Sequence, residues 1–161
     1  MVFLKKLSIF FMAICFVFVA AGCSKANGKF EFLIPEDYVG WAYIIYDQSE
    51  YPEIKKENGV TTFRIGEDGI LKTSNKDAFY GTSTDRYFYV DEEGNKVKEL
   101  DQIEDIHNKG AGKMDGGGGV KNGVEYTIEA LPVVESFFVG DKSLMKNYKE
   151  VYPEDEMEQT K

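Results

Sequence analysis

Histidine, cysteine and proline are scarce in this sequence, and the first two scarcities exclude whole classes of protein. Its 161 residues include one His, two Cys and four Pro. A Ser or Cys nucleophile needs a basic partner, and only His107 is available for that role. A transition-metal site needs two or more His or Cys ligands. No G-x-S-x-G, H-E-x-x-H or C-x-x-C spacing occurs, so we expect no catalytic residue, no metal site and no cofactor.

A hydrophobic run long enough to cross a bilayer is also missing. The longest apolar stretch, Ile9–Ala21, has thirteen residues, fewer than the ~18 that a membrane-spanning helix needs. Lys5 and Lys6 precede it and no acidic residue does, which is the layout of a secretory signal. The stretch runs into Ala20-Ala21-Gly22-Cys23, which resembles the bacterial lipobox except that Ala20 stands where Leu is usual.

The lipobox resemblance implies cleavage between Gly22 and Cys23, after which Cys23 becomes a lipidated N-terminus. The thioether needs a thiol at the cleavage point, and several acyl chains anchor a protein where one binds only marginally. We therefore expect a signal peptide at 1–22, a lipidated tether at 23–29, and a protein held at the extracytoplasmic face of the cell membrane. The alternative is an ordinary secretory peptide with a chance cysteine nearby.

Acidic residues outnumber basic ones by 28 to 19. Loss of Lys5 and Lys6 with the signal peptide takes the formal net charge from −9 to −11. Such a surface disfavours nucleic acid and anionic lipid headgroups. Cys23 would be the single cysteine of the mature chain, so no internal disulfide can form and the fold depends on its own core. We expect a monomer whose partner is an envelope ligand or protein.

Short apolar runs between turn residues predict a chain of β-strands. Val39–Tyr46 is apolar on both alternating faces, which indicates a central strand covered on both sides. Val124–Ala130 alternates apolar and polar residues, which indicates one buried face. Arg86–Val90 and Asn95–Leu100 predict a hairpin. Further strands are expected at Phe30–Ile34, Val60–Ile65, Ile70–Thr73 and Val133–Val139. Pro132 is expected to end the strand before Val133.

Three other segments depart from the strand pattern. Gly110–Gly119 contains six glycines in ten residues, which predicts a flexible loop because ordering glycine is costly. Asp101–Asn108 fits either one helical turn or a loop. Asp141 is expected to cap a helix from Lys142 to about Tyr152.

The fold class that these patterns favour is all-β. Seven or more short strands with turn residues every eight to twelve positions are typical of a sandwich. We expect a single β-sandwich domain at 30–152, immunoglobulin-like or transthyretin-like, with one short C-terminal helix. The acidic tail at 153–161 is expected to be disordered.

Four short motifs are spaced along this expected domain: FLIPEDYVGW at 32–41, GILKTS at 69–74, a tyrosine-rich strand at 87–89 and FFVG at 137–140. Together they resemble a family of small bacterial, Bacillus-type lipoproteins of unknown function. Asp37 replaces the usual Gly of the opening motif, and Gly66 replaces a Pro of the family. The resemblance spans about Phe30 to Tyr148 and implies a shared fold, but it implies no activity.

Aromatic residues are the one positive signal for a binding site. They make up 14% of the chain, and exposed Tyr and Trp are common contacts for sugars and peptides. Our candidate ligand contacts are Tyr38, Tyr51, Tyr80 and Tyr87. The alternative is that most aromatics are core residues whose hydroxyls reach the surface; Trp41 in particular is expected in the core.

His107 and the acidic loops complete the set of candidates. Glu104 or Asp105 could accept a hydrogen bond from the His107 ring, but we interpret His107 as a solvated histidine in an acidic turn. The acidic loops at 91–93 and 104–105 offer oxygen atoms for calcium, yet no EF-hand spacing occurs. Charged, solvated loops are the expected outcome.

The function that these features favour is a surface-anchored lipoprotein without enzymatic activity, acting as a binding or envelope-associated accessory module. The alternative is a hydrolase of cell-wall polymer or peptide that uses paired carboxylates as acid and base. A cleft with two facing carboxylates would favour the enzyme, and a flat aromatic patch would favour the binding module.

Overall fold

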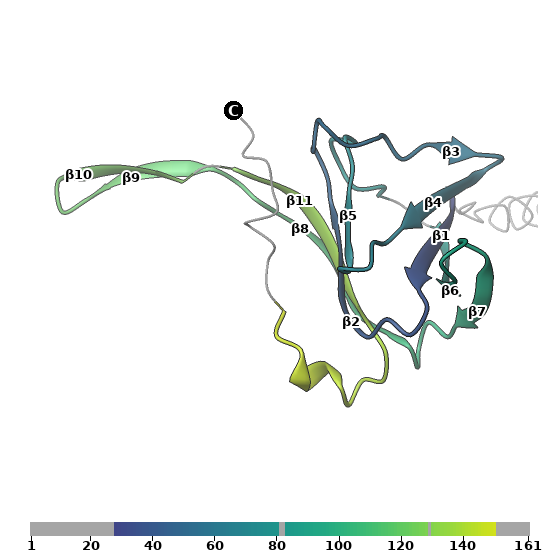
Figure 1. The fold of residues 1–161 in the computed structure, drawn as a ribbon. Helices are drawn as coiled ribbons and strands as arrows, with labels where there is room; N and C mark the ends of the chain where they lie inside the picture. The colour runs from purple at the N-terminus through teal and green to yellow at the C-terminus, as the bar shows by residue number, and fades with distance from the viewer. Residues whose placement is uncertain (1–27, 81–82, 129, 151–161) are drawn as a thin grey trace, which may run out of the picture.

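The computed structural model of the protein describes residues 28–80, 83–128 and 130–150. Within these ranges the chain forms β-strands and one turn of 3₁₀ helix at Met145–Asn147, so the fold is all-β as predicted (Figure 1). The strands are β1 (Gly28–Pro35), β2 (Gly40–Ile45), β3 (Lys56–Glu57), β4 (Val60–Arg64), β5 (Ile70–Lys72), β6 (Ser83–Val90), β7 (Lys96–Leu100), β8 (Ile106–Met114), β9 (Gly117–Lys121), β10 (Val124–Ile128) and β11 (Leu131–Val139).

The strands form two mixed sheets and a two-stranded ribbon. Sheet A has the order β3-β4-β1-β6-β7, sheet B has the order β5-β2-β11-β8, and β9 pairs with β10. Strand β1 is parallel to both of its neighbours, and β2 is parallel to β5. This pairing differs from the antiparallel sheets of the immunoglobulin-like sandwich that we expected.

The parallel pairs follow from the path of the chain between the sheets. From β1 the chain crosses to β2 in sheet B, returns to β3 and β4 in sheet A, and crosses again to β5. Parallel strands need a long crossover connection, which is usually a helix. Here each crossover runs through the opposite sheet, so the described strands form parallel pairs without a helical connection between them.

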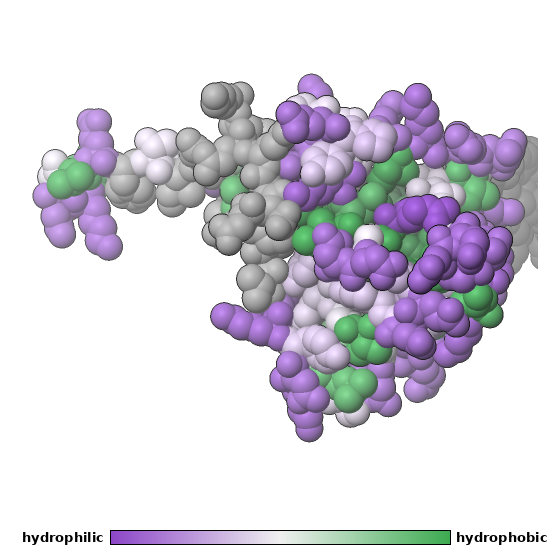
Figure 2. Space-filling view, viewed as in Figure 1, coloured by the Kyte–Doolittle hydropathy of each residue, from purple (hydrophilic) through white to green (hydrophobic). Residues whose placement is uncertain are grey.

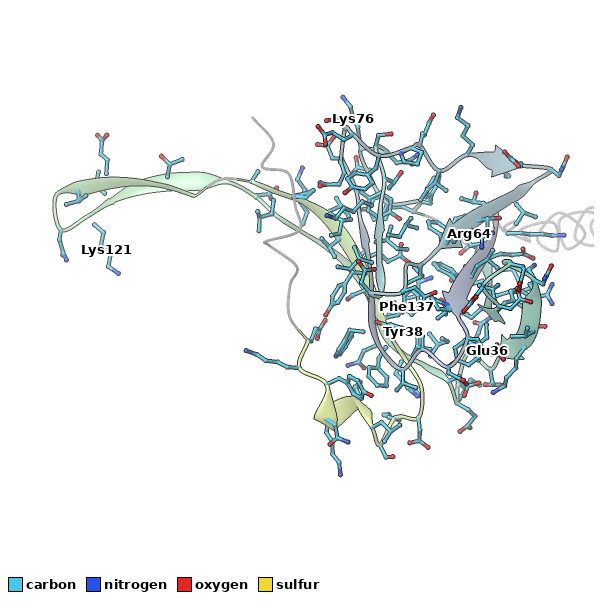
Figure 3. All side chains as sticks on the ribbon, in the orientation of Figure 1. Glu36, Tyr38, Arg64, Lys76, Lys121 and Phe137 are labelled. Atoms are coloured by element: carbon cyan, nitrogen blue, oxygen red, sulfur yellow. The ribbon has the colours of Figure 1, made fainter. Side chains whose placement is uncertain are left out.

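Aromatic rings from both sheets meet in one hydrophobic core. The ring of Phe32 in β1 stacks on Phe63 in β4 and on Tyr87 in β6, at centroid distances of 4.7 and 4.6 Å. Phe137 in β11 meets Phe32 edge-on at 5.4 Å and is labelled inside the body in Figure 3. Every residue of β2 is buried, which confirms the strand predicted to be covered on both faces.

The C-terminal segment covers one end of the outer face of sheet B. Trp41 is buried, as predicted, and its indole N–H donates a hydrogen bond to the carbonyl of Tyr148 at 3.2 Å. The Tyr148 ring packs against Phe138 at a centroid distance of 5.5 Å. Tyr148 itself has an extended backbone, which places its carbonyl within reach of Trp41.

The helix predicted from Lys142 is wrong in length and type. The Asp141 carboxylate does accept a hydrogen bond from the Ser143 amide at 2.7 Å, so the predicted capping interaction forms. Regular helical structure is limited to the 3₁₀ turn at Met145–Asn147. Packing of the segment on Trp41 overrides its helical pattern, and residues 148–150 are not helical. Positions 151 and 152 of the predicted helix and the acidic tail lie outside the described residues.

The flexible loop predicted at Gly110–Gly119 is also wrong, because these residues belong to β8, to β9 and to the short break between them. Leu131 pairs with Met114 and Ile128 pairs with Gly117, so β8–β9 and β10–β11 form the two sides of one long hairpin. Asn122 and Gly123 connect the two sides with φ angles of 54° and 78°. Asn-Gly with positive φ at both residues is the preferred two-residue hairpin turn.

The other predicted strands are confirmed, including the hairpin of β6 and β7, and their observed ends differ from the predicted ends by up to three residues. In the segment Asp101–Asn108, which the pattern left undecided, residues 101–105 form a turn and residues 106–108 are the start of β8. Pro132 does not interrupt the strand as predicted but lies inside β11. The pairing register shifts between Leu131 and Val134, and such an irregularity accommodates proline in a strand.

The turn after β1, in the opening motif, packs closely against the turn before β5. Asp37 adopts a left-handed conformation, with φ 61°, in the turn after β1. The hydroxyl of Tyr38 donates a hydrogen bond to the carbonyl of Trp41 at 2.6 Å. A Cβ atom on Gly69 would lie only 1.9 Å from that hydroxyl oxygen, and Gly69 has a φ of +81°. Gly69 is therefore required by both its backbone conformation and the ring next to it.

We predict that Gly69→Ala destabilises the protein by at least ~2 kcal/mol, because Tyr38 must move and the backbone is strained. Gly110→Ala is the matched control: a Cβ there meets nothing within 4 Å, so a gain of about 0.5 kcal/mol is expected from the stiffer unfolded chain. Urea denaturation of both variants measures the difference. Equal stability of the two variants would contradict the interlocked turn.

Candidate functional site

The long hairpin leaves the body of the protein and continues as an isolated ribbon (Figure 1). Strand β2 pairs with β11 only as far as Ile45 opposite Val134. Beyond that point the two sides of the hairpin pair with each other and with no third strand of the described chain. A two-stranded ribbon is only marginally stable in water by itself, so this part of the chain depends on its attachment to sheet B.

Apolar side chains lie at the tip of the ribbon, far from the core. Val120 and Val124 are 66% and 67% exposed. Figure 2 shows an apolar spot among hydrophilic residues at the end of the ribbon, where Figure 3 labels Lys121. The strand predicted at Val124–Ala130 forms, but Val124 is not buried against the body as its alternation suggested. Apolar side chains displayed this far from a core favour a contact surface.

A cluster of charged and phenolic groups lies where the ribbon joins the body. The ammonium of Lys109 in β8 donates to Asp85 in β6 at 2.5 Å and lies 3.4 Å from a carboxylate oxygen of Glu135 in β11. The Tyr46 hydroxyl donates to the other Glu135 oxygen at 3.1 Å. Lys109 also lies 4.8 Å from the centroid of the Phe32 ring. The cluster therefore connects sheet A, sheet B and the base of the ribbon.

The protonation states of this cluster are fixed around neutral pH. Burial acts to lower the pKa of Lys109, but Tyr87 and the two carboxylates outweigh burial and raise it above its ordinary value. Burial, followed by the nearby Glu135, raises the pKa of Tyr46. Burial also raises the pKa of Tyr87 to about 12, against the opposing effect of Lys109. All three groups keep their protons, which suits a structural tie better than proton transfer.

The four candidate tyrosines do not form one site. Tyr87 is only 2% exposed and stacks in the core, and Tyr38 is half-buried with its hydroxyl bonded to Trp41. Tyr80 is 69% exposed, and of the four only the Tyr87 ring is placed beside the polar cluster, 5.9 Å from the Lys109 ammonium. Ligand contact by the tyrosines stays a prediction, for which only Tyr51 and Tyr80 present exposed rings.

Tyr51 borders a shallow depression of about 460 Å³ between the ends of β1, β4 and β6 in sheet A and the edge strand β5 of sheet B. The ammonium of Lys72 lies 5.4 Å from the centroid of the Tyr51 ring. Arg64, labelled in Figure 3, lines the same depression and forms no ion pair within the described part of the chain. Acidic side chains at 67, 91 and 92 share the lining, so no single charge dominates the depression.

The remaining candidates are placed away from any catalytic arrangement. The Nε2 atom of His107 lies 3.1 Å from the carbonyl of Glu104, in the turn that precedes β8. Asp101 holds this turn through hydrogen bonds from the amides of Ile103 and Glu104. Across the described ranges, no group of three or more His, Cys, Asp or Glu is arranged to hold a metal ion.

Sequence reasoning missed the polar cluster because its members are far apart in the chain. Lys109, Asp85 and Glu135 come from three strands and carry no local motif. The ribbon, in contrast, had a local signal: Asn122-Gly123 lies between two runs that pair in register, and that dipeptide is the strongest short-range hairpin signal.

Comparison with known proteins places this fold in a family. The profile described as "Family of unknown function (DUF6843)" matches residues 27–143. The chain belongs to DUF6843. This match agrees with the expected family in its unknown function and in covering nearly the whole domain. No curated protein sequence matches the chain.

The DUF6843 fold is similar to a crystal structure described as "Putative Lipoprotein from Bacillus anthracis". The TM-score is 0.51 at 24% sequence identity, and the match covers 79% of this chain and 81% of the other. At this identity the likeness concerns the fold. None of the helical structure in the described DUF6843 chain is long and apolar enough to cross a membrane.

We predict that stability falls between about pH 10 and 12. Tyr46, Tyr87 and Lys109 hold protons more tightly when folded, so the stability they add is complete below their unfolded pKa values and is lost as pH rises toward the folded ones. Tyr87, raised from 10.0 to about 12, accounts for about 2–3 kcal/mol of that loss.

Thermal melts between pH 8 and 12 test this expectation. Tyr46→Phe should lower the melting temperature at pH 8, because Glu135 loses a donor, and should reduce the slope above pH 10. Tyr51→Phe serves as the control because its exposed ring lies outside the cluster. A melting temperature that stays constant up to pH 12 would show that the cluster does not couple to folding.

Proposed function

We propose that the protein is a lipid-anchored binding module at the extracytoplasmic face of the cell membrane, without enzymatic activity. The projecting ribbon carries this proposal. A projecting ribbon with exposed valines at its tip adds little to the core, and its isolated strands are costly to keep ordered. Contact with a partner accounts for such an element, whereas a catalytic role does not.

The lipid anchor rests on the sequence at Cys23. The lipobox-like Ala20–Cys23 follows an apolar run of signal-peptide length. The description of the similar Bacillus anthracis structure as a candidate lipoprotein supports the same assignment for this chain. We further propose that the two sheets on their shared core are best classed as a β-sandwich, although their parallel pairs are unusual for that class.

The position of the ribbon fits a module that faces away from the membrane. Only four residues lie between Cys23 and Gly28, so an anchor at Cys23 lies within ~17 Å of the start of β1. In Figure 1 the ribbon extends to one side of the body, and β1 lies on the opposite side. An anchored molecule would therefore direct β9 and β10 away from the bilayer.

The carboxylate-hydrolase alternative has less support from the geometry. Asp85 and Glu135 are the carboxylates that share a half-buried site, and the Lys109 ammonium lies between them. Paired glycosidase carboxylates need one proton between them and access to a sugar ring. Here the oxygen atoms of Asp85 and Glu135 already interact with the Lys109 ammonium and, for Glu135, with the Tyr46 hydroxyl.

The anchor is tested by Cys23→Ala. We expect the variant to appear in an unprocessed or soluble form, because Cys23 is the only lipid acceptor in the mature chain. Membrane fractionation and metabolic labelling with a fatty acid measure this outcome, with Ser24→Ala as the matched control. A Cys23→Ala protein that remains membrane-bound and correctly cleaved would contradict the anchor.

The binding role is tested by measuring binding and turnover of the full-length protein in detergent against peptidoglycan fragments, wall polysaccharides and peptides. Val120→Ser combined with Val124→Ser should weaken binding at least tenfold, because contact residues at an interface centre contribute about 1–2 kcal/mol each. His107→Ala should leave binding unchanged. Saturable hydrolysis that Asp85→Asn or Glu135→Gln abolishes would overturn the proposal in favour of the enzyme.

A further inference from the structure

We propose that the ribbon binds an extended, acidic polypeptide segment, which adds as a strand along the open edge of β8 and β9. This inference rests on the proposed binding function and names the class of partner. The open backbone edge carries the argument, and the charge of the edge selects the partner.

The edge is long and unpaired. Strand β8 is the outermost strand of sheet B, and β9 pairs only with β10. Although the register shifts twice where β8 pairs with β11, β8 and β9 lie on the same side of the hairpin and together present an edge from Ile106 to Lys121, about 50 Å long. Apart from pairing with β10 and β11, the described chain makes no backbone hydrogen bond to these residues.

The edge is only partly protected. Proteins cover an edge, shorten it, bend it with bulges, or place proline, lysine and inward-pointing charges on it, because outward N–H and C=O groups attract other strands. Two register irregularities interrupt the pairing of β8 with β11, and Lys109 and Lys113 lie in β8. Strand β8 is nine residues long and contains no proline. Its one inward-pointing charge, Lys109, is held by Asp85 and Glu135 instead of blocking the edge.

Three glycines in these strands are not required by the packing of the protein itself. A Cβ atom at Gly110, Gly112 or Gly117 would meet nothing within 4 Å, and none of the three has a positive φ. Glycine weakens a strand and often marks a place where another backbone approaches closely. Gly110 and Gly112 also line a depression of about 450 Å³ on the outer face of sheet B, beside the open edge.

Charge favours an acidic partner on this edge. Residues 106–121 contain three lysines and one aspartate, in a chain with a net charge of −9. Lys109 is neutralised within the polar cluster, whereas Lys113 and Lys121 are exposed and form no ion pair in the described part of the chain. The opposite side of the ribbon carries Glu125 in β10, so an acidic strand is attracted to β8–β9 and repelled by β10.

The test measures binding of a labelled twelve-residue peptide of alternating Val and Glu to the full-length protein in detergent, by fluorescence anisotropy. Two further peptides carry N-methyl groups on either the Val or the Glu residues. Alternate N–H groups of a strand point to opposite edges, so one methylated peptide should lose at least tenfold in affinity and the other should bind normally. Hydrogen exchange should show slowed amides within Ile106–Lys121.

Charge and location are tested in parallel. The combination Lys113→Glu and Lys121→Glu should weaken the peptide at least tenfold, and Lys98→Glu, on the distant strand β7, should not. A peptide of alternating Val and Lys should bind far more weakly. The proposal would be overturned if the two methylated peptides bound equally well or lost binding equally. It would also be overturned if the slowed amides lay on another edge, or if β8 paired with a second copy of the chain. If the Val120 and Val124 variants still lose envelope binding while no peptide binds, the binding function stands and this inference fails.

Discussion

The ammonium of Lys109 lies at the junction of the three parts of the molecule. It belongs to β8 at the base of the ribbon, pairs with Asp85 of sheet A and Glu135 of sheet B, and faces the ring of Phe32 in the core. Loss of one partner would leave a half-buried charge uncompensated, which is more costly than the pair itself is stabilising. The orientation of the ribbon relative to the sheets therefore depends on this ion cluster.

The opposite end of the domain is ordered by neutral contacts. Tyr38 bonds to the carbonyl of Trp41, the indole of Trp41 bonds to Tyr148, and the hydroxyl of Tyr89 bonds to the carbonyl of Tyr38. Aromatic groups thus provide both packing area and hydrogen bonds at this end. This accounts for the high tyrosine content of the chain without assigning each tyrosine to a ligand site.

The strands could be predicted from sequence wherever a local pattern decided them. Apolar runs between turn residues predicted β2, β4, β6 and β11, and these strands form. The glycines of β8 and β9 predict a loop because ordering glycine is entropically costly, but the Asn122-Gly123 turn pairs these residues in a hairpin. The helix predicted after Asp141 does not form beyond one 3₁₀ turn because the segment packs on Trp41. Strand order and the Lys109 cluster lay beyond prediction, because they join residues that no local pattern connects.

The position of β11 has a consequence for how the protein folds. It is the last strand of the described residues, yet it lies between β2 and β8 in the middle of sheet B. Strand β1 is central in sheet A but needs β4 and β6, which come after a crossing through sheet B. Sheet B cannot close until β11 is present, and the core that sheet A shares with it stays incomplete until Phe137 of β11 packs on Phe32. Non-local pairing of this kind is slow.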